Sequence, residues 1–426
     1  MSPWTGRTLH FVGIGGAGMS GWARVALQLG AAVSGTDRAD GPALRGLREL
    51  GATIHVGHAA ELVPDGAEVV YSSAVPADNP ERAHARARGW PERPRAELLH
   101  ELTALRRTIA VAGAHGKTTT TSMLAHVLLD LGAEPGYLIG GTLSTTGQNA
   151  DWGAGEWLVV EADESDRSLL ALDVDIAVVT NVELDHHATF GSLREVEEVF
   201  RGFLAGAPQA VLPDEPAVRA LRAEGLPVTA FATPAPPLDL RVPGEHNQRN
   251  AAAALEALAL AGFDRAEAAA ALASFGGARR RFEELGRTPA GIRVVDDYAH
   301  HPTEVAAAIA AARDLAPGRV VAIFQPHLFS RTRALAAELG TALAAANVPV
   351  VLDVYPARER AADFPGVSGR VVAAAVADAR PGRDVLWLPR FADVERVLPP
   401  RLRPDDLVLV LGAGDVDELG RSLVAG

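Results

Sequence analysis

Short apolar runs recur along almost the whole chain, and each is followed by a longer stretch whose apolar positions have helical spacing. The runs at residues 8–13, 108–112 and 176–179 read as buried strands. Strands that alternate with helices in this way are typical of α/β domains with mainly parallel sheets. The pattern therefore predicts an α/β protein.

Breaks in this alternation divide the chain into three blocks. The first ends at the proline-rich residues 90–95, and the second opens with a helical stretch before the strand at residues 108–112. The third repeats a strand followed by a helix four times. Since 426 residues correspond to about three domains of average size, we predict domains at residues 1–95, 96–276 and 277–426.

Composition narrows the class of protein. Hydrophobic residues make up 48% and charged residues 22%, so each block can bury a core, which excludes disordered and coiled-coil classes. The absence of cysteine excludes disulfides, thiolate metal sites and cysteine nucleophiles. No apolar run is long enough to cross a membrane and the N-terminus lacks a basic region, so we expect a cytoplasmic protein without membrane contact. A net charge of -13 argues against a general nucleic-acid binder.

One count stands out among the charged residues. Of the 40 basic residues, only Lys117 is lysine and all others are arginine. Arginine replaces an exposed lysine without difficulty, whereas a site that needs a compact ammonium cannot accept a planar guanidinium. Lys117 is therefore expected to have a specific role.

Lys117 follows a glycine-rich segment that has the order needed for phosphate binding. A buried strand at residues 109–112 leads into the loop and then into a helix, so that backbone N–H groups, the helix N-terminus and the lysine can all face phosphates. The loop residues in question are Gly113, Ala114, His115, Gly116, Lys117, Thr118 and Thr119. The strict pattern of such loops is not met, because Val111 stands five positions before Gly116. The alternative is a glycine turn with an incidental lysine, which the lone lysine disfavours.

A second glycine loop lies near the N-terminus. Gly13, Gly15 and Gly18 follow the first strand, and Asp37 ends the next strand, where an acid would bind a ribose. The loop is compatible with a dinucleotide, with a nucleotide sugar or with a ligand-free turn. Two phosphate-binding loops in one chain favour an enzyme that combines a nucleotide-tagged substrate with ATP chemistry.

Acidic and histidine clusters end two strands of the middle block. Glu161, Asp163 and Asp166 follow the strand at residues 157–160, and His186 follows the strand at residues 176–179. Carboxylates and imidazoles beside nucleotide phosphates would suit Mg²⁺. We expect Glu161 and His186 to contact the metal, whereas Asp163 and Asp166 could equally be solvated loop residues.

The last block carries a second histidine cluster. His300 and His301 end one strand, and His327 and Arg331 end the next strand along the chain. If these strands are adjacent and parallel, the four side chains share one rim, with one of the paired histidines structural. Zinc is disfavoured, because the helical HxxxH and HExxH spacings are absent. An arginine at this rim suits a carboxylate or a phosphate.

Together these segments resemble a known family. The chain is similar to the Mur ligases over nearly its whole length, and most of all to the branch that adds L-alanine to UDP-N-acetylmuramic acid. The motifs that carry the resemblance are GIGGAGMSG, GAHGKTTTT, EADESD, TNVELDHH, GEHNQRNAAAA, RRRFE, DDYAHHPTEV, FQPHLFSRT and LDVYPARE. The resemblance implies a Rossmann-like UDP-binding domain, a central P-loop ATPase domain and a C-terminal Rossmann-like domain for the amino acid.

The resemblance also implies roles for individual residues. The UDP-substrate site would include Gly15, Gly16, Gly18, Asp37, Ser72 and Ser73. The ATP site would include Gly113, His115, Gly116, Lys117, Thr118, Thr119, Asn250, Arg281 and Asp297. The metal would lie at Thr118, Glu161 and His186, and the amino acid at Tyr298, His327 and Arg331. The catalytic group would comprise Lys117, Glu161, His186, His327 and Arg331.

The implied reaction is amide-bond formation in peptidoglycan precursor synthesis. With ATP and Mg²⁺, the lactyl carboxylate of UDP-N-acetylmuramic acid would become an acyl phosphate, which L-alanine then attacks. The protein would act as a monomer or a weak homodimer.

Three alternatives stay open at this point. A recycling ligase would attach a tripeptide to the same UDP-sugar, and the GIGGAGMSG segment favours the alanine branch over it. An NAD-dependent oxidoreductase would leave Lys117 unexplained. A nucleotide sensor without turnover is kept because Ala114 stands where the family usually has threonine.

Overall fold

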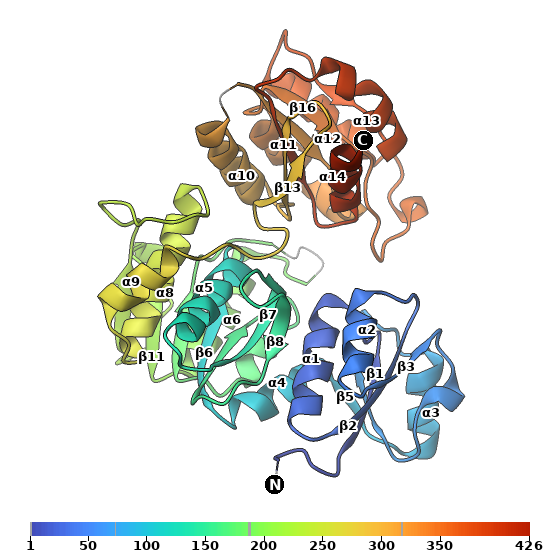
Figure 1. Cartoon of the computed structure of the whole chain (residues 1–426), viewed down its shortest axis with the longest axis vertical. Helices are drawn as coiled ribbons and strands as arrows, with labels where there is room; N and C mark the ends of the chain where they lie inside the picture. Colours follow the sequence, from blue (N-terminus) through green and yellow to red (C-terminus); the bar gives the residue numbers. More distant parts are fainter. Residues whose placement is uncertain (1, 73, 186–188, 317) are drawn as a thin grey trace. The chain divides into compact units, whose positions relative to one another are not determined.

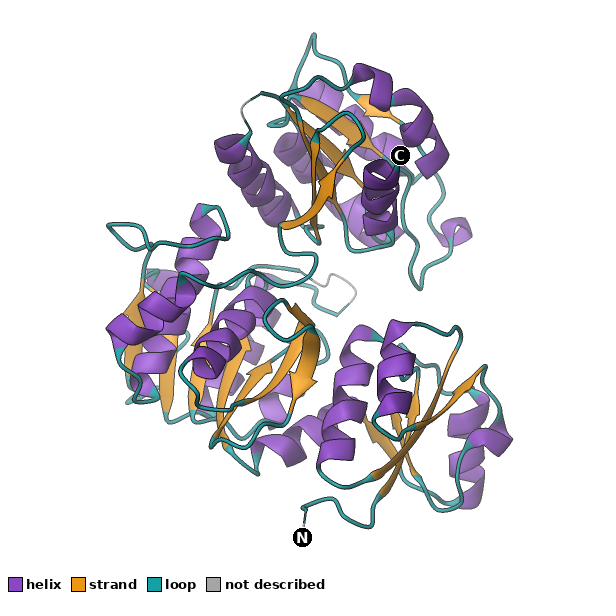
Figure 2. Ribbon diagram, in the orientation of Figure 1, coloured by secondary structure: helices purple, strands orange, loops and turns teal. Residues whose placement is uncertain are grey.

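The computed structural model describes residues 2–72, 74–185, 189–316 and 318–426 (Figure 1). Within these residues the strands form three sheets, each with helices packed against it (Figure 2). Most strand pairs are parallel, and the two exceptions lie at sheet edges. The predicted α/β class with mainly parallel sheets is confirmed.

The N-terminal sheet has five parallel strands in the order β3-β2-β1-β4-β5. The order turns back after β1, because β2 and β4 flank it. Such a switch point leaves a crevice at the carboxyl ends of the strands, where ligands of open α/β sheets bind. The elements are β1 (Thr8–Val12), α1 (Ala17–Gln28), β2 (Ala32–Asp37), α2 (Pro42–Glu49), β3 (Thr53–Val56), η1 (Ala60–Leu62), β4 (Glu68–Tyr71), α3 (Pro80–Arg88), β5 (Glu92–Pro94) and α4 (Arg95–Thr103).

The central sheet has seven strands in the order β12-β11-β10-β6-β9-β7-β8. β6 lies inside it between β10 and β9, so the segments that follow these three strands meet at one edge. The strands are β6 (Arg107–Ala112), β7 (Gly136–Leu143), β8 (Gln148–Asp151), β9 (Trp157–Glu161), β10 (Ile176–Val179), β11 (Gln209–Pro213) and β12 (Val228–Phe231). The helices are α5 (Lys117–Asp130), η2 (Ser168–Ala171), α6 (Leu193–Ala205), α7 (Pro216–Arg219), α8 (Glu245–Leu260) and α9 (Arg265–Leu272).

The C-terminal sheet has six strands in the order β13-β14-β18-β15-β16-β17. The strands are β13 (Glu283–Arg287), β14 (Arg293–Asp297), β15 (Val320–Phe324), β16 (Val348–Val351), β17 (Leu386–Trp387) and β18 (Leu407–Leu411). The helices are α10 (Pro302–Leu315), α11 (Phe329–Leu343), η3 (Ala361–Asp363), α12 (Gly369–Ala379), α13 (Phe391–Val397), η4 (Pro399–Arg401) and α14 (Val416–Ala425).

This strand order corrects one expectation. β14 and β15 are not adjacent, because β18, the last strand in sequence, pairs with both of them. Alternate residues of β18 face different apolar clusters, with Leu409 in one and Val408 in the other. A strand that is apolar on both faces is stable in the middle of a sheet covered by helices on both sides, which is why the C-terminal strand inserts there.

The described part of the chain divides into two compact units. One comprises residues 1–183, 192–239 and 249–276, and the other comprises residues 184–191, 240–248 and 277–426. The domain limits at residues 95/96 and 276/277 stay a prediction. No helix among the described residues is both long and apolar enough to span a membrane.

Candidate active site

The lysine loop lies between β6 and α5, as the sequence predicted. Gly113 and Gly116 both have positive φ angles, of 141° and 79°, which favour glycine. A Cβ atom on Gly113 would lie 2.0 Å from Oγ1 of Thr180, and one on Gly116 would lie 2.4 Å from Oδ1 of Asn250. Both positions therefore require glycine for space as well as for conformation, and Asn250 is placed directly beside the loop.

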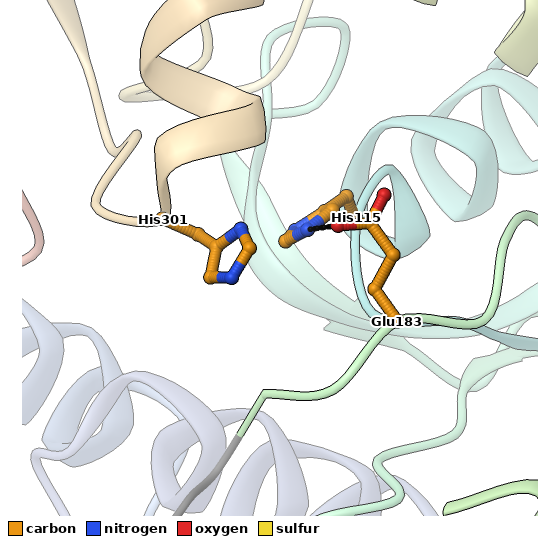
Figure 3. Close-up of side chains that lie close together, drawn as sticks. All are labelled: His115, Glu183 and His301. Carbon is orange, nitrogen blue, oxygen red and sulfur yellow. Dashed lines mark hydrogen bonds and ion pairs between the residues drawn. The ribbon is translucent and has the colours of Figure 1, made fainter. Parts of the chain in front are cut away.

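The end of β10 holds the loop in place. The backbone N–H of His115 donates to Oδ1 of Asn181 at 2.9 Å, and Nδ2 of Asn181 donates back to the carbonyl of His115 at 2.9 Å. The His115 ring lies 3.3 Å from the Glu183 carboxylate (Figure 3). His301, which Figure 3 also labels, belongs to the other unit. Sequence reasoning missed Asn181, although it lies in the acidic cluster that follows a strand beside β6.

Lys117 lies at the first position of α5 with its ammonium group surrounded by oxygen atoms. Nζ donates to the carbonyl of Gly113 at 2.5 Å and to the Glu164 carboxylate at 3.0 Å. Burial alone would lower the pKa of Lys117, but the carboxylates of Glu164, Asp163 and Glu161 outweigh it and hold the pKa above its usual value. Lys117 is thus a fixed cation at the mouth of the glycine loop.

Glu161 connects the loop helix to the neighbouring strand β7. Its carboxylate accepts a hydrogen bond from the hydroxyl of Thr118 at 3.0 Å and another from the N–H of Gly140 at 2.8 Å. A carboxylate and a hydroxyl are the hard oxygen donors that Mg²⁺ prefers, so the residues present fit this metal. Thr119 lies buried in the same turn of α5. The predicted ligand His186 lies outside the described residues.

The N-terminal glycine loop leads from β1 into α1. Asp37 accepts the N–H of Gly15 at 2.8 Å, and a Cβ atom on Gly15 would lie 2.9 Å from the same oxygen. Gly16 is the N-cap residue of α1, and no side chain accepts a hydrogen bond from the first N–H groups of this helix. These N–H groups are therefore open to an anion. A Cβ on Gly18 would lie 2.9 Å from the Arg95 guanidinium.

Asp37 was predicted as a ligand-binding acid. In the structure its carboxylate also holds the glycine loop in place, by accepting the N–H of Gly15. Ser72 is half-buried just after β4, and Ser73 lies outside the described residues.

Aromatic and imidazole rings form a chain at the carboxyl edge of the C-terminal sheet. Tyr298 and His300 have ring centroids 5.5 Å apart, His300 and His327 are 6.0 Å apart, and His327 stacks on Tyr355 at 5.8 Å. His300 and His327 of the predicted rim therefore lie together even though β18 separates the two strands. Tyr355, which follows β16, was not predicted.

Arg331 belongs to the same rim. Its guanidinium lies 3.3 Å from Nδ1 of His327 and donates to Oδ1 of Asp185 at 3.0 Å. Both Arg331 and Asp185 are buried. Asp185 was not predicted, because nothing in the sequence links it to a residue so distant along the chain.

Burial sets the protonation of this rim. Burial lowers the pKa of His300 to about 4, and burial with the neighbouring His300 and Arg331 lowers that of His327 to about 3. Both imidazoles are consequently neutral at neutral pH. Glu304 accepts the backbone N–H of His300 at 3.1 Å and that of His301 at 3.3 Å, which closes the start of α10.

Arg281 and Asp297 flank the ring of Tyr298. The Arg281 guanidinium lies 5.0 Å from the ring centroid. Asp297 accepts the N–H groups of Phe282 and Ala299 at 2.8 Å each, and burial raises its pKa to about 6. Asp297 therefore anchors the segment that carries Arg281.

Comparison with known proteins identifies the family. Residues 8–107 match the model "Mur ligase family, catalytic domain", residues 111–235 match "Mur ligase middle domain", and residues 280–414 match "Mur ligase, glutamate ligase domain". The chain belongs to the Mur ligase family. The resemblance seen in its motifs and the three-part α/β architecture are thereby confirmed, and Mur ligase membership decides against the oxidoreductase alternative.

Individual Mur ligases match this one over nearly their whole length. The UDP-N-acetylmuramate–L-alanine ligase of Thermobifida fusca is 46% identical, with 98% of this chain and 96% of the relative covered. That of a Nocardioides species is 48% identical, with 97% and 94% covered. The solved UDP-N-acetylmuramate–alanine ligase of Thermotoga maritima superposes with a TM-score of 0.82 at 28% identity, covering 98% of both chains.

Proposed function

We propose that this Mur ligase joins L-alanine to the lactyl carboxylate of UDP-N-acetylmuramic acid at the expense of ATP. The observation that carries the proposal is that relatives bearing the name of this ligase are 42–48% identical over 96–99% of the chain. The rest of the proposal follows from the chemistry of the residues described above.

A carboxylate is a poor acyl donor, so the reaction begins with its activation. An oxygen of the lactyl carboxylate attacks the γ-phosphorus of ATP, ADP leaves, and an acyl phosphate forms. Lys117 supplies a fixed positive charge for the phosphate oxygens, and the N–H groups of the loop and of the first turn of α5 cradle them. Asn250 beside Gly116 adds a polar contact on the nucleotide side of the loop.

Mg²⁺ completes the proposed ATP site. Bound at Thr118 and Glu161, with His186 as the third predicted ligand, it would neutralise charge on the transferring phosphoryl group. Glu161 is suited to hold such an ion because the N–H of Gly140 and the hydroxyl of Thr118 fix both of its oxygens.

The second step takes place at the amino-acid rim. The neutral amine of alanine attacks the acyl carbon, and inorganic phosphate leaves as the amide forms. Arg331 would bind the alanine carboxylate, and Tyr298 and His327 would border it. The neutral ring of His327 could accept the proton that the amine loses, but its low pKa makes it a weak base for this role.

Phosphate release by the purified protein tests the proposal. With ATP and Mg²⁺, release should require both UDP-N-acetylmuramic acid and L-alanine, and omission of either should abolish it. Release only with the tripeptide in place of alanine would make the protein the recycling ligase. No release with any pair, despite binding of UDP, would make it a nucleotide sensor. A cytoplasmic location is part of the proposal, because ATP is available there.

A further inference from the structure

The buried carboxylate of Glu81, in the N-terminal part of the chain, is not used in the reaction proposed above. Glu81 lies in the first turn of α3 and is 0% exposed. Next to it, the layer between α3 and the sheet holds an apolar cluster that includes Val12, Val69 and Ala85. An ionisable group in such a layer needs an explanation, because apolar residues would pack there at lower cost.

Three side chains donate hydrogen bonds to this carboxylate. Nε2 of His10 lies 2.9 Å from Oε2, the hydroxyl of Thr36 lies 2.7 Å from the same oxygen, and Nδ1 of His58 lies 2.7 Å from Oε1. His10 is fixed in turn, since its Nδ1 lies 2.8 Å from the hydroxyl of Ser34. Burial would raise the pKa of Glu81, but these donors outweigh it and hold the pKa below its usual value.

The contacts of Glu81 connect segments at the edge where the substrate is proposed to bind. Thr36 immediately precedes Asp37, whose carboxylate closes the glycine loop at Gly15. α3 begins at the end of the loop that follows β4, and Ser72 lies in that loop. A single carboxylate thus ties the ends of β2 and β3 to the start of α3.

His58 is the member of this network that faces outward. It follows β3 at the carboxyl edge of the sheet, and 21% of its side chain is exposed. Nδ1 is engaged by Glu81 and Thr36, whereas Nε2 has no hydrogen-bond partner among the described residues. A carboxylate that holds one imidazole nitrogen fixes the orientation of the ring and compensates a positive charge on it.

We propose that His58, as an imidazolium whose charge the Glu81 carboxylate compensates, donates a hydrogen bond from Nε2 to a pyrophosphate oxygen of the UDP-sugar, and that Glu81 is the positioning residue that orients His58. The inference rests on the proposed function, because it names a contact of the same substrate. It assigns Glu81 no contact with the substrate and no part in ATP or alanine binding.

Glu81→Gln tests the positioning role, because the amide keeps the shape of the side chain but cannot accept all three donors. The KM for UDP-N-acetylmuramic acid should rise about tenfold, the effect of losing one hydrogen bond to a charged group. The KM values for ATP and alanine should stay unchanged. Glu68→Gln is the matched control, since Glu68 also accepts from two side chains, Arg7 and Arg93, but lies at the opposite end of the same sheet.

His58→Gln and the double variant separate positioning from general support of the fold. If Glu81 acts through His58, the double variant should bind UDP, measured by calorimetry, no more weakly than His58→Gln alone. Additive losses, or an unchanged affinity in His58→Gln, would overturn the proposal. His58 is partly exposed, so this variant is expected to fold even if Glu81→Gln does not.

Failure of the inference is distinguishable from failure of the proposed function. If the wild-type protein shows no ligase turnover, the proposed function fails, and UDP binding by the variants still tests the His58 contact. If the wild type turns over and both variants match it in substrate KM and in UDP affinity, only the inference fails.

Discussion

Arg331 shares its guanidinium between the carboxylate of Asp185 and the ring of His327, and all three side chains lie at the proposed alanine site. A buried cation needs a compensating charge, and Asp185 supplies it. Arg331 is therefore held in one orientation. A small amino acid such as alanine makes few contacts with a protein, so its binding depends on a partner that is already correctly oriented.

Arg331→Ala should mainly raise the KM for alanine, by about tenfold or more, because it removes one charge-assisted hydrogen bond to the alanine carboxylate. Asp185→Asn should act in the same direction, because it leaves the guanidinium buried without its counter-charge. Steady-state kinetics with varied alanine measures both effects. Arg194→Ala, at an exposed position of α6, is the control and should leave the KM unchanged. An unchanged alanine KM in Arg331→Ala would reject the assigned role.

The lysine loop is the element whose geometry is most constrained. Gly116 combines a positive φ angle with a close approach to Asn250, so Gly116→Ala should distort the loop and displace the side chain of Asn250. We expect a loss of ATP affinity and of turnover of at least about tenfold, with little effect on UDP binding.

A matched glycine gives the control for this element. Gly46 lies in the middle of α2 with open space around its position, so Gly46→Ala should leave turnover unchanged and stabilise the protein by about 0.5–1 kcal/mol. Thermal unfolding and ATP titration of the two variants check both statements. Equal behaviour of the two variants would contradict the constraint on Gly116.

β14 carries a second buried carboxyl group with consequences for pH. Burial raises the pKa of Asp296 to about 7, although Arg280 donates to it at 3.1 Å. The folded state thus binds this proton more tightly than the unfolded chain does, and the contribution of Asp296 to the free energy of unfolding falls as pH rises from about 4 to about 7.

Asp296→Asn removes this titration. Compared with the wild type, the variant should therefore gain stability as the pH is raised from 5 to 8, whatever its stability at pH 5. Thermal unfolding of both proteins across this range measures the difference. A constant difference, or one of opposite sign, would show that Asp296 does not retain its proton in the folded protein.

At the scale of the whole molecule, the two glycine loops belong to different sheets and should bind their ligands independently. Lys117→Ala should abolish turnover and remove the rise in melting temperature caused by ATP, while the rise caused by UDP-N-acetylmuramic acid persists. Ligand-dependent thermal unfolding tests this. Loss of both shifts would contradict the separation of the two sites.

The phosphate loop, the family and the order of strands and helices were determined by the sequence alone. Backbone groups next to one another in the chain make a glycine loop, so the local segment from Gly113 to Thr118 already contains most of what phosphate binding needs. The same holds for the start of α1 at Gly16. In each case the backbone groups that can face a phosphate are local, whereas the side chains that hold the loop, such as Asn181, Glu161 and Asp37, come from other segments.

Contacts between distant segments were decided only by the tertiary structure. The insertion of β18 between β14 and β15, the pairing of Asp185 with Arg331, and the network around Glu81 all depend on which strands become neighbours. Hydrophobic patterning identifies strands but does not order them in a sheet, because every buried strand is apolar in the same way. The sequence therefore identified the residues that carry the chemistry, and the tertiary structure decided which side chains from other segments hold those residues in position.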